Sequence, residues 1–443
     1  MIHTYQNNFF TTSSFNTSVR IVSPQQQLRT TMSVVTDPVQ QYELITKNLQ
    51  ETLNGQIIKD ILEKEKRPLR IYWGTAPTGK PHCGYFVPMV KIAHFLKAGC
   101  EVTVLLADMH AYLDNMKAPL EVVQDRSKYY EHVVKAMLKS INVPIEKLKF
   151  VTGSSFQLTP EYTMDIFKLA NKVSQNDAKR AGADVVKQTE NPLLSGLIYP
   201  LMQALDEQHL QCDAQFGGVD QRKIFVLAEE NLPSLGYKKR AHLMNKMVPG
   251  LNQGGKMSAS DQSSKIDILE DPKTVKTKIS KAFLAPGVVE DNGLIAFLEH
   301  VVQPIQELVT ETPGVFNFHI NRPEKYGGEI TYTSIEQLKQ DYTDLKLAAA
   351  DLKSGATDRI NELLAPIRAE FEASPEFQRT QADGYPVEKP KEVKKVKKVK
   401  NKGTRYPGAG SGAGGAPAGA KADGSAEQQV EAAAETLKET NLQ

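Results

Sequence analysis

The sequence has few cysteines, no long apolar run and almost no net charge, and each shortage excludes a class of protein. Its three cysteines, Cys83, Cys100 and Cys212, lack the spacing of a metal site or a disulfide framework, which indicates a reducing compartment. No apolar run approaches the ~20 residues that a membrane-spanning helix needs. Basic residues exceed acidic ones by only two, 54 against 52, so net charge alone does not indicate nucleic-acid binding. We therefore expect a soluble intracellular protein, and its 443 residues, 40% of them hydrophobic, predict two or three domains.

Acidic residues are absent from the N-terminal segment, where the first one is Asp37. This segment also contains two arginines, Arg20 and Arg29, and such a composition is typical of a mitochondrial presequence. Met32 is an alternative start, so the segment is either an import signal or an optional leader. We expect residues 1–36 to be a disordered leader and the protein to be cytoplasmic, with a mitochondrial form if residues 1–31 are translated and act as a presequence.

Strand-like apolar runs alternate with helical patterns between about residues 40 and 265. Strands are expected at 69–73, 101–107, 148–152 and 212–216, and helices at 85–96, 119–140, 160–173 and 197–210. This alternation predicts an α/β fold with a doubly wound parallel sheet of the Rossmann type. Ligands of such sheets bind at the carboxyl ends of the strands, near the point where the strand order reverses. The turns after Trp73 and at residues 108–110 would lie there.

The pattern becomes mostly helical after residue 265, for example at 294–309, with a break at Pro304, and at 335–352. We expect a catalytic domain over 37–265, a helical domain over 266–380 and a disordered tail over 381–443. Residues 389–402 carry eight lysines and one glutamate, and a Gly/Ala-rich stretch follows them. Such a tail cannot form a packed core. It is either a solvated segment or an arm that adds salt-sensitive affinity for RNA.

Two short segments have the character of phosphate-binding loops. Residues 77–85 (Pro-Thr-Gly-Lys-Pro-His-Cys-Gly-Tyr) connect a strand to a helix N-terminus, where unpaired N–H groups and the helix dipole favour an anion. Residues 254–260 (Gly-Gly-Lys-Met-Ser-Ala-Ser) place Lys256 on a flexible loop. Residues 74–80 also have the spacing of a P-loop. However, Pro81 stands where that motif needs Ser or Thr, and it disfavours helical geometry at Lys80.

Three polar residues of the helix at 197–210 point to a binding pocket. Tyr199, Gln203 and Asp206 share one helix face because they are spaced i, i+4 and i+7. This face is either solvated or lines a pocket. A polar cluster follows the next strand at 213–222, with Gln215, Asp220 and Gln221 around a Gly-Gly bend, and this favours the pocket.

With these motifs the chain, over about residues 40–380, resembles the eukaryotic and archaeal-type tyrosyl-tRNA synthetases, which are class I enzymes. The matching stretches are 72–76 (Tyr-Trp-Gly-Thr-Ala), 108–114 (Asp-Met-His-Ala-Tyr-Leu-Asp), 219–223 (Val-Asp-Gln-Arg-Lys) and the Lys-Met-Ser loop at 256–258. The resemblance implies that His82 and Lys256 are the catalytic residues. It implies a tyrosine pocket made of Tyr72, Tyr199, Gln203, Asp206 and Gln221. The implied ATP-binding residues are Gly74, Thr75, Pro77, Thr78, Gly79, His82, Gly84, Tyr85, Lys256, Met257, Ser258 and Ser260.

The resemblance also implies the reaction and its partners. ATP with Mg²⁺ would activate L-tyrosine, and the tyrosyl group would pass to tRNA(Tyr), with no prosthetic group and no protein metal site. Tyr326 would stack on an anticodon base and Asp351 would hydrogen-bond the first anticodon base. Without the resemblance, Tyr326 is equally a packing residue and Asp351 a charge at a helix end. The family members are homodimers, which predicts an interface in the catalytic domain, around 119–140.

The sequence departs from the class pattern at two positions. Tyr85 stands where the first motif usually has a second His, and Ala259 stands where the second motif often has a second Lys. Positive charge would then rest more heavily on Lys256, assisted by K⁺ or another lysine.

Two other functions stay open at this point. A tryptophanyl-tRNA synthetase shares the fold and motifs, but Asp206 and Tyr72 argue against it because an indole offers no hydroxyl. A non-catalytic RNA-binding protein on the same fold would not need His82 or Lys256.

Overall fold

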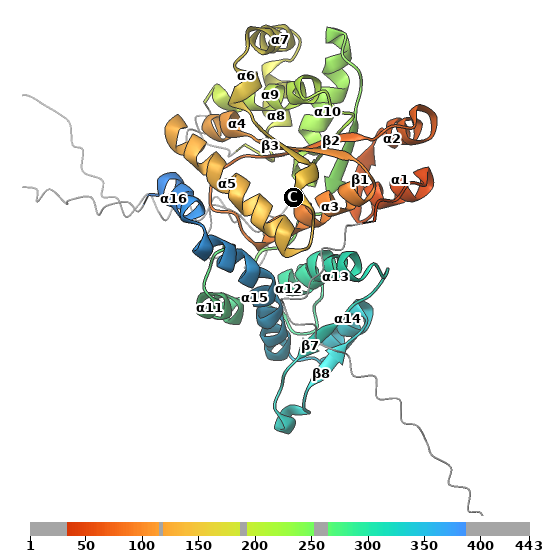
Figure 1. Cartoon of the computed structure of the whole chain (residues 1–443), viewed down its shortest axis with the longest axis vertical. Helices are drawn as coiled ribbons and strands as arrows, with labels where there is room; N and C mark the ends of the chain where they lie inside the picture. Colours follow the sequence, from red (N-terminus) through yellow and green to blue (C-terminus); the bar gives the residue numbers. More distant parts are fainter. Residues whose placement is uncertain (1–32, 115–117, 187–192, 252–264, 387–443) are drawn as a thin grey trace, which may run out of the picture. The chain divides into compact units, whose positions relative to one another are not determined.

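The computed structural model describes residues 33–114, 118–186, 193–251 and 265–386. Its centre is a six-stranded sheet in the order β1-β6-β5-β2-β3-β4 (Figure 1). The strands are β1 (Leu49–Leu53), β2 (Arg70–Thr75), β3 (Glu101–Leu106), β4 (Leu148–Thr152), β5 (Ala214–Gly218) and β6 (Ala241–Asn245).

Five of these strands are parallel, and β1 is the antiparallel edge strand beside β6. In the centre, Tyr72 of β2 pairs with Thr103 of β3 on one side and with Gln215 of β5 on the other. The chain runs outward from β2 to β3 and β4, then returns to β5 across β2. The strand order therefore reverses between β2 and β5, and a ligand site is expected at their carboxyl ends.

Helices cover both faces of the sheet (Figure 1). Side chains of a strand alternate between the faces. Ile71 and Trp73 belong to a cluster with α3 and α5, whereas Tyr72 faces α9. The helices of this part are α1 (Pro38–Thr46), α2 (Gly55–Asp60), α3 (Phe86–Lys97), α4 (Asp108–Leu113), α5 (Leu120–Ser140), α6 (Ser154–Gln157), α7 (Pro160–Ala170), α8 (Gln175–Ala181), α9 (Ser195–His209) and α10 (Arg222–Asn231).

Several helices begin at a strong sequence signal. Asp37, Thr159 and Asp271 each accept a hydrogen bond from an N–H of the first helical turn, and each precedes a proline. A short polar side chain satisfies an otherwise unpaired N–H there, while proline has no N–H to satisfy.

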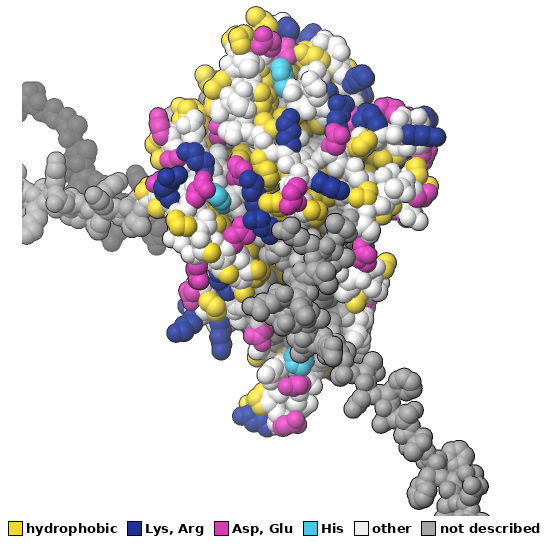
Figure 2. Space-filling view, in the orientation of Figure 1, with side chains coloured by type: hydrophobic (Ala, Val, Ile, Leu, Met, Phe, Trp, Pro, Cys, Tyr) yellow, Lys and Arg dark blue, Asp and Glu magenta, His cyan; other side chains and the backbone are white. Residues whose placement is uncertain are grey.

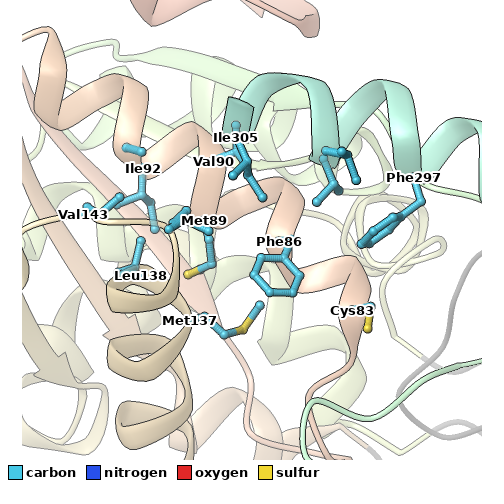
Figure 3. Packing of buried hydrophobic residues seen from close by; sticks show 14 of the residues in the cluster. Cys83, Phe86, Met89, Val90, Ile92, Met137, Leu138, Val143, Phe297 and Ile305 are labelled. Carbon is cyan, nitrogen blue, oxygen red and sulfur yellow. The ribbon is translucent and has the colours of Figure 1, made fainter. Parts of the chain in front are cut away.

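The C-terminal part is mostly helical and also contains a two-stranded antiparallel sheet. Its core is continuous with that of the sheet region. Figure 3 shows Phe86 and Met89 of α3 beside Met137 of α5 and near Phe297 and Ile305, all within one buried cluster. The elements are α11 (Pro272–Lys281), α12 (Gly293–Phe297), α13 (Gln303–Thr310), β7 (Phe318–Ile320), β8 (Ile330–Tyr332), α14 (Ile335–Thr343), α15 (Ala349–Ala373) and α16 (Pro375–Gly384).

The predicted α/β fold with a doubly wound parallel sheet is confirmed, with some corrections. The strand expected at 212–216 is two residues later, and the edge strand β1 and strand β6 were not expected. The helix expected at 335–352 is two helices, α14 and α15, because Leu345 adopts a left-handed conformation (φ 60°) between them. The predicted break at Pro304 takes the form of a π-helical turn, Leu298–Val302, before α13.

The boundary predicted at residue 265 is not marked by a gap in the core, so the division into domains stays a prediction. Of the leader predicted at 1–36, residues 1–32 lie outside the described residues, whereas the N–H of Val35 donates to the backbone oxygen of Lys97 (2.8 Å). The tail predicted from residue 381 begins later, because α16 continues to Gly384, and residues 387–443 lie outside the described part. None of the described helices combines the length and the apolar character needed to cross a bilayer.

Candidate active site

A cavity of about 550 Å³ opens at the carboxyl ends of β2 and β5, where the strand order reverses. Most of the predicted site residues line it. The predicted residues that line the cavity are Tyr72, Gly74, Thr75, Thr78, Gly79, His82, Gly84, Tyr85, Tyr199, Gln203, Asp206 and Gln221. Pro77 is buried beside the loop but does not line the cavity. Lys256, Met257, Ser258 and Ser260 lie outside the described residues, so their places in the site stay predictions.

Asp206 of α9 is a buried carboxyl group that is only partly satisfied. Its Oδ1 accepts hydrogen bonds from Nε2 of Gln157 (2.7 Å) and from the hydroxyl of Tyr162 (2.8 Å). Its Oδ2 has no hydrogen-bond partner among the described residues. Burial raises the pKa of Asp206 to about 8, although the hydrogen bonds from Gln157 and Tyr162 oppose this shift. A buried polar atom without a partner is costly, and a ligand in the cavity could supply the partner.

His110 of α4 also lines the cavity and lies next to the same carboxyl group. Its Nε2 lies 3.7 Å from Oδ2 of Asp206. Burial lowers the pKa of His110 to about 4, so the imidazole is neutral at neutral pH and the contact is not an ion pair. The ring of His110 packs edge-on against Tyr199, with centroids 4.7 Å apart.

Amide and phenol groups form the wall beside Asp206. Nε2 of Gln203 donates to Oε1 of Gln221 (2.8 Å), and the Tyr72 hydroxyl lies 3.4 Å from the backbone oxygen of Gln203. Gly217 allows this arrangement, because a Cβ there would lie 2.5 Å from Oε1 of Gln221. Tyr199, Gln203 and Asp206 are all buried, so the helix face predicted from their spacing lines the pocket and is not solvated.

His82 begins a short 3₁₀ helix, Cys83–Tyr85, at the turn between β2 and α3. Its Nδ1 accepts the N–H of Gly84 (3.2 Å), which places the ring proton of a neutral imidazole on Nε2. Burial, and then the charge of Lys265, lower the pKa of His82 to about 3, so the ring is neutral. The Tyr85 ring packs edge-on against His82, at 5.3 Å between centroids, and its hydroxyl lies 3.2 Å from Oγ1 of Thr75. A neutral N–H donor at a helix N-terminus suits a phosphate oxygen.

The sequence did not indicate several residues of the site. Gln157 and Tyr162, which hold Asp206, come from α6 and α7, and no local pattern links them to it. Asn245, the last residue of β6, and Lys246 and Met247, which follow it, line the cavity. The apolar run of β6 would have revealed them as residues at a strand end. His110 lies in the turn that was predicted to reach this edge of the sheet.

The cavity combines two kinds of environment. One end offers a carboxyl group, phenols and amides, and the other offers backbone at a helix N-terminus with a neutral histidine. Among the described residues, no group of three His, Cys, Asp or Glu side chains could hold a metal ion. The arrangement can therefore hold a small polar organic molecule next to an anion.

The two residues predicted to contact the anticodon lie far along the chain from this cavity. Tyr326, in the connection between β7 and β8, is 63% exposed, which argues against the packing alternative. Asp351 lies in the first turn of α15, where its carboxylate is 3.5 Å from Nη1 of Arg322. Nε of Arg322 also donates to the backbone oxygen of Gly328, so Arg322 connects Asp351 to the loop that carries Tyr326.

Comparison with known proteins gives consistent matches. The family model described as tRNA synthetases class I (W and Y) matches residues 63–365. A protein named tyrosine–tRNA ligase, cytoplasmic, from Saccharomyces cerevisiae is 71% identical over 373 residues, which cover 84% of this chain and 94% of that protein. The protein of the same name from Xenopus tropicalis is 56% identical over 344 residues, 78% of this chain and 63% of that protein.

A solved structure extends this likeness to three dimensions. The tyrosyl-tRNA synthetase from Archaeoglobus fulgidus, in complex with L-tyrosine, superposes with a TM-score of 0.67 at 35% identity. The match covers 75% of this chain and 99% of that chain.

Proposed function

The chain belongs to the family of class I tRNA synthetases for tryptophan and tyrosine, and within it we infer that the chain is a tyrosine–tRNA ligase of the cytoplasmic type. The yeast relative supports this over nearly its whole length, and the Xenopus relative over about two thirds of its own. The structural observation that carries the choice of tyrosine is the buried Asp206, whose Oδ2 lacks a partner among the described residues and lies in the same cavity as His82.

We propose that Asp206 and Tyr72 bind the phenol of L-tyrosine. Asp206 can hydrogen-bond the phenol in either protonation state. The neutral acid donates to the phenol oxygen, and the carboxylate accepts the phenol O–H. Phenylalanine and tryptophan would leave Oδ2 of Asp206 buried and unpaired. A site built to hydrogen-bond a substrate hydroxyl rejects analogues that lack it for this reason, and tyrosyl-tRNA synthetases are the standard example.

The ammonium group of tyrosine is proposed to lie against Tyr199, Gln203 and Gln221. Gln203 and Gln221 already form a hydrogen-bonded pair at 2.8 Å, which fixes the orientation of both amides. Amide and phenol oxygens accept hydrogen bonds from an ammonium group, which has only donors. This orientation would point the tyrosine carboxylate toward the turn that carries His82.

In the first step, an oxygen of the tyrosine carboxylate attacks the α-phosphorus of ATP. The new bond joins carboxylate oxygen to phosphorus, the bond to the bridging oxygen breaks, and pyrophosphate leaves with its electron pair. The family uses ATP, and Mg²⁺ is proposed to arrive with it as part of the substrate. The protein mainly positions the reactants and stabilises charge. The Nε2–H of His82 is proposed to donate to a phosphate oxygen, and Lys256 to neutralise the pyrophosphate.

Lys246 is a candidate for the lysine that assists Lys256. It is exposed at the rim of the cavity, directly after β6. Ala259 cannot contribute charge, and Lys246 would bring an ammonium group to the same cavity.

In the second step, a hydroxyl of the 3′-terminal adenosine of tRNA(Tyr) attacks the carbonyl carbon of the adenylate and loses its proton. The bond from that carbon to the phosphate oxygen breaks, and AMP leaves with the electron pair. The exposed ring of Tyr326 supports a role in stacking on an anticodon base, with Asp351 as a hydrogen-bond acceptor. Residues 1–31 and the lysine-rich tail lie outside the described residues, so an import signal and an RNA-binding arm stay predictions.

A homodimer is also proposed, but with its interface away from α5. That helix packs against α3, α4, α15 and α16, and its fully exposed side chains are all polar or charged, namely Glu121, Gln124, Lys128 and Lys139. Exposed apolar side chains lie instead on α6, α7 and the start of α9, where Figure 2 shows hydrophobic side chains on the surface at the α7 end. Several exposed apolar residues on neighbouring elements are typical of an interface. They are Leu158, Met164, Phe167, Leu193, Leu194 and Ile198.

The test of this function is amino-acid-dependent exchange between ATP and pyrophosphate. Exchange driven by tyrosine, but not by phenylalanine or tryptophan, together with tyrosylation of tRNA(Tyr), is expected. Exchange driven by tryptophan would favour the tryptophanyl enzyme, and RNA binding without any exchange would favour the non-catalytic alternative.

A further inference from the structure

The loop that lines the ATP side of the cavity is held from behind by side chains of distant elements. The backbone oxygen of Thr78 accepts Nη1 of Arg126 (2.7 Å), and that of Lys80 accepts Nζ of Lys265 (2.9 Å). Between them, the oxygen of Gly79 accepts two hydroxyl groups, which occupy both its lone pairs. These hydroxyls belong to Tyr130 (2.5 Å) and Tyr385 (2.9 Å). We call Arg126, Tyr130, Lys265 and Tyr385 the carbonyl clamp.

The clamp determines where the N–H groups of the loop point. Every described peptide bond is trans, so the C=O and the N–H of one peptide group point in opposite directions. The clamped oxygens of Thr78 and Gly79 therefore direct the N–H groups of Gly79 and Lys80 away from α5 and α16. Neither N–H has a hydrogen-bond partner among the residues described. Thr78 and Gly79 line the cavity, so a phosphate there would meet backbone whose orientation the clamp has fixed in advance.

Tyr385 is the member of the clamp from the far C-terminal end, at the C-cap of α16, and several contacts fix its place. Nε of Arg126 donates to the backbone oxygen of Gly384 (2.8 Å), and the Arg126 guanidinium lies 4.8 Å from the centre of the Tyr385 ring. Nζ of Lys80 lies 5.6 Å from the centre of the same ring.

Gly384 shows how closely α16 approaches α5. A Cβ at this position would lie 3.1 Å from both the backbone nitrogen and Cα of Arg126, closer than ordinary van der Waals contact. The approach brings the Tyr385 hydroxyl within reach of Gly79. The contact thus depends on backbone packing as well as on the tyrosine side chain.

We propose that Tyr385 is a positioning residue for ATP: from outside the cavity, it orients the loop at 78–80 through the oxygen of Gly79. It touches no substrate, and its effect on the reaction passes through the loop. This inference rests on the proposed use of ATP at this site. It also makes the C-terminal end of the helical region a part of the nucleotide site.

The test compares Tyr385→Phe with Tyr129→Phe. The first change removes one of the two hydroxyls that reach Gly79 and leaves that of Tyr130 in place. The second removes a hydroxyl from the same α5–α16 contact, where it meets Gln381 at 3.5 Å and not the loop. In tyrosine-dependent exchange of ATP and pyrophosphate, Tyr385→Phe should raise the KM for ATP about three- to ten-fold, the worth of one hydrogen bond. The KM for tyrosine should stay within about two-fold, and Tyr129→Phe should change neither.

A second measurement does not depend on activity. Hydrogen exchange of the amides in residues 74–82 should be faster in Tyr385→Phe than in the wild-type protein, and unchanged in Tyr129→Phe. An unchanged KM for ATP, an equal rise in both KM values, or unchanged amide exchange would overturn the inference. If the wild-type protein showed no tyrosine-dependent exchange, the proposed function would fail, and amide exchange would still decide whether Tyr385 orders the loop.

Discussion

Nε2 of His110 lies 3.7 Å from Oδ2 of Asp206, and neither atom has a hydrogen-bond partner among the described residues. Both side chains are almost completely buried, and burial shifts the pKa of each toward its neutral form. The unliganded pocket thus holds two polar groups that are too far apart to satisfy each other. This cost is offset when a ligand bridges them, and it leads to the first prediction.

The stability of the unliganded protein should rise when Asp206 is changed to Asn. The pKa of Asp206 is about 8 in the folded protein, so an unfolded chain loses this proton near pH 4 while the folded protein keeps it. Folding stability that depends on this group is therefore lost as pH rises from about 4 to about 8. The substituted amide does not titrate, and its oxygen can still accept from Gln157 and Tyr162. The variant should gain on the order of 1–3 kcal/mol over wild type at pH 8, and less at pH 5.

Urea unfolding at the two pH values measures this difference, and Asp213→Asn is the matched control. Although burial opposes it, hydrogen bonds from Arg67 and Arg70 lower the pKa of Asp213, so removing that charge should destabilise the protein at pH 8. A gain for Asp206→Asn that does not grow with pH would contradict the assigned ionisation.

Selection of tyrosine over phenylalanine should weaken in Tyr72→Phe. This change removes one hydroxyl beside Asp206 and keeps the shape of the pocket. The ratio of kcat/KM for tyrosine to that for phenylalanine should fall about ten-fold, as expected for one hydrogen bond to substrate. Tyr342→Phe removes a hydroxyl outside the cavity, where it donates to the oxygen of Ala285, and should leave the ratio unchanged. If Tyr72→Phe and Tyr342→Phe had the same ratio, Tyr72 would not bind the phenol of the substrate.

Two substitutions of His82 should separate its structural role from its chemical one. The amide oxygen of His82→Asn can replace Nδ1 as acceptor for the Gly84 N–H, but its NH2 group ends nearer the backbone than Nε2 and does not reach the same phosphate oxygen. Its melting temperature should match that of wild type, while adenylate formation slows about 100-fold, the usual effect of losing a donor to developing charge. His82→Ala should show both a lower melting temperature and slower adenylate formation. Because the pKa of His82 is about 3, the wild-type rate should show no titration of this group between pH 6 and 8.

The proposed dimer should dissociate when Phe167 is changed to Glu. This side chain of α7 is 63% exposed, and a carboxylate buried at an apolar interface has a large desolvation cost. Light scattering during gel filtration should show a monomer. Phe283→Glu alters a side chain that is 49% exposed outside the proposed interface and should remain dimeric. A dimeric Phe167→Glu protein would place the interface elsewhere.

Recognition of tRNA should suffer in Tyr326→Ala without loss of tyrosine activation. Stacking on one base contributes about 1–3 kcal/mol, so the KM for tRNA(Tyr) should rise about five- to 100-fold. Exchange of ATP and pyrophosphate, which needs no tRNA, is the internal control. A rise in KM for tRNA that is matched by slower exchange would indicate a folding defect.

The parts of the site that follow from the sequence are those in which neighbouring residues share an element. The spacing of Tyr199, Gln203 and Asp206 determines one helix face, and the strand-to-helix turn places His82. These predictions about position agree with the structure because they depend on local geometry alone.

The residues that were missed depend on tertiary packing. Gln157 and Tyr162 reach Asp206 only because α6, α7 and α9 pack together, and Tyr385 reaches Gly79 across 306 positions of sequence. The split between α14 and α15 was missed for a different reason: a leucine rarely adopts the left-handed conformation that Leu345 has. The conformational preferences of single residues predict neither these tertiary contacts nor this helix break.

The buried cluster shared by α3, α5 and the C-terminal helices has a consequence for how the protein unfolds. Because Phe297 and Ile305 complete the packing around Phe86, neither side of residue 265 can lose its structure without exposing apolar surface on the other. Heating should therefore melt both sides in one cooperative transition, visible as a single calorimetric peak. A fragment that ends at residue 265 would expose to water the apolar side chains that the C-terminal helices cover. It should therefore aggregate rather than behave as a smaller enzyme.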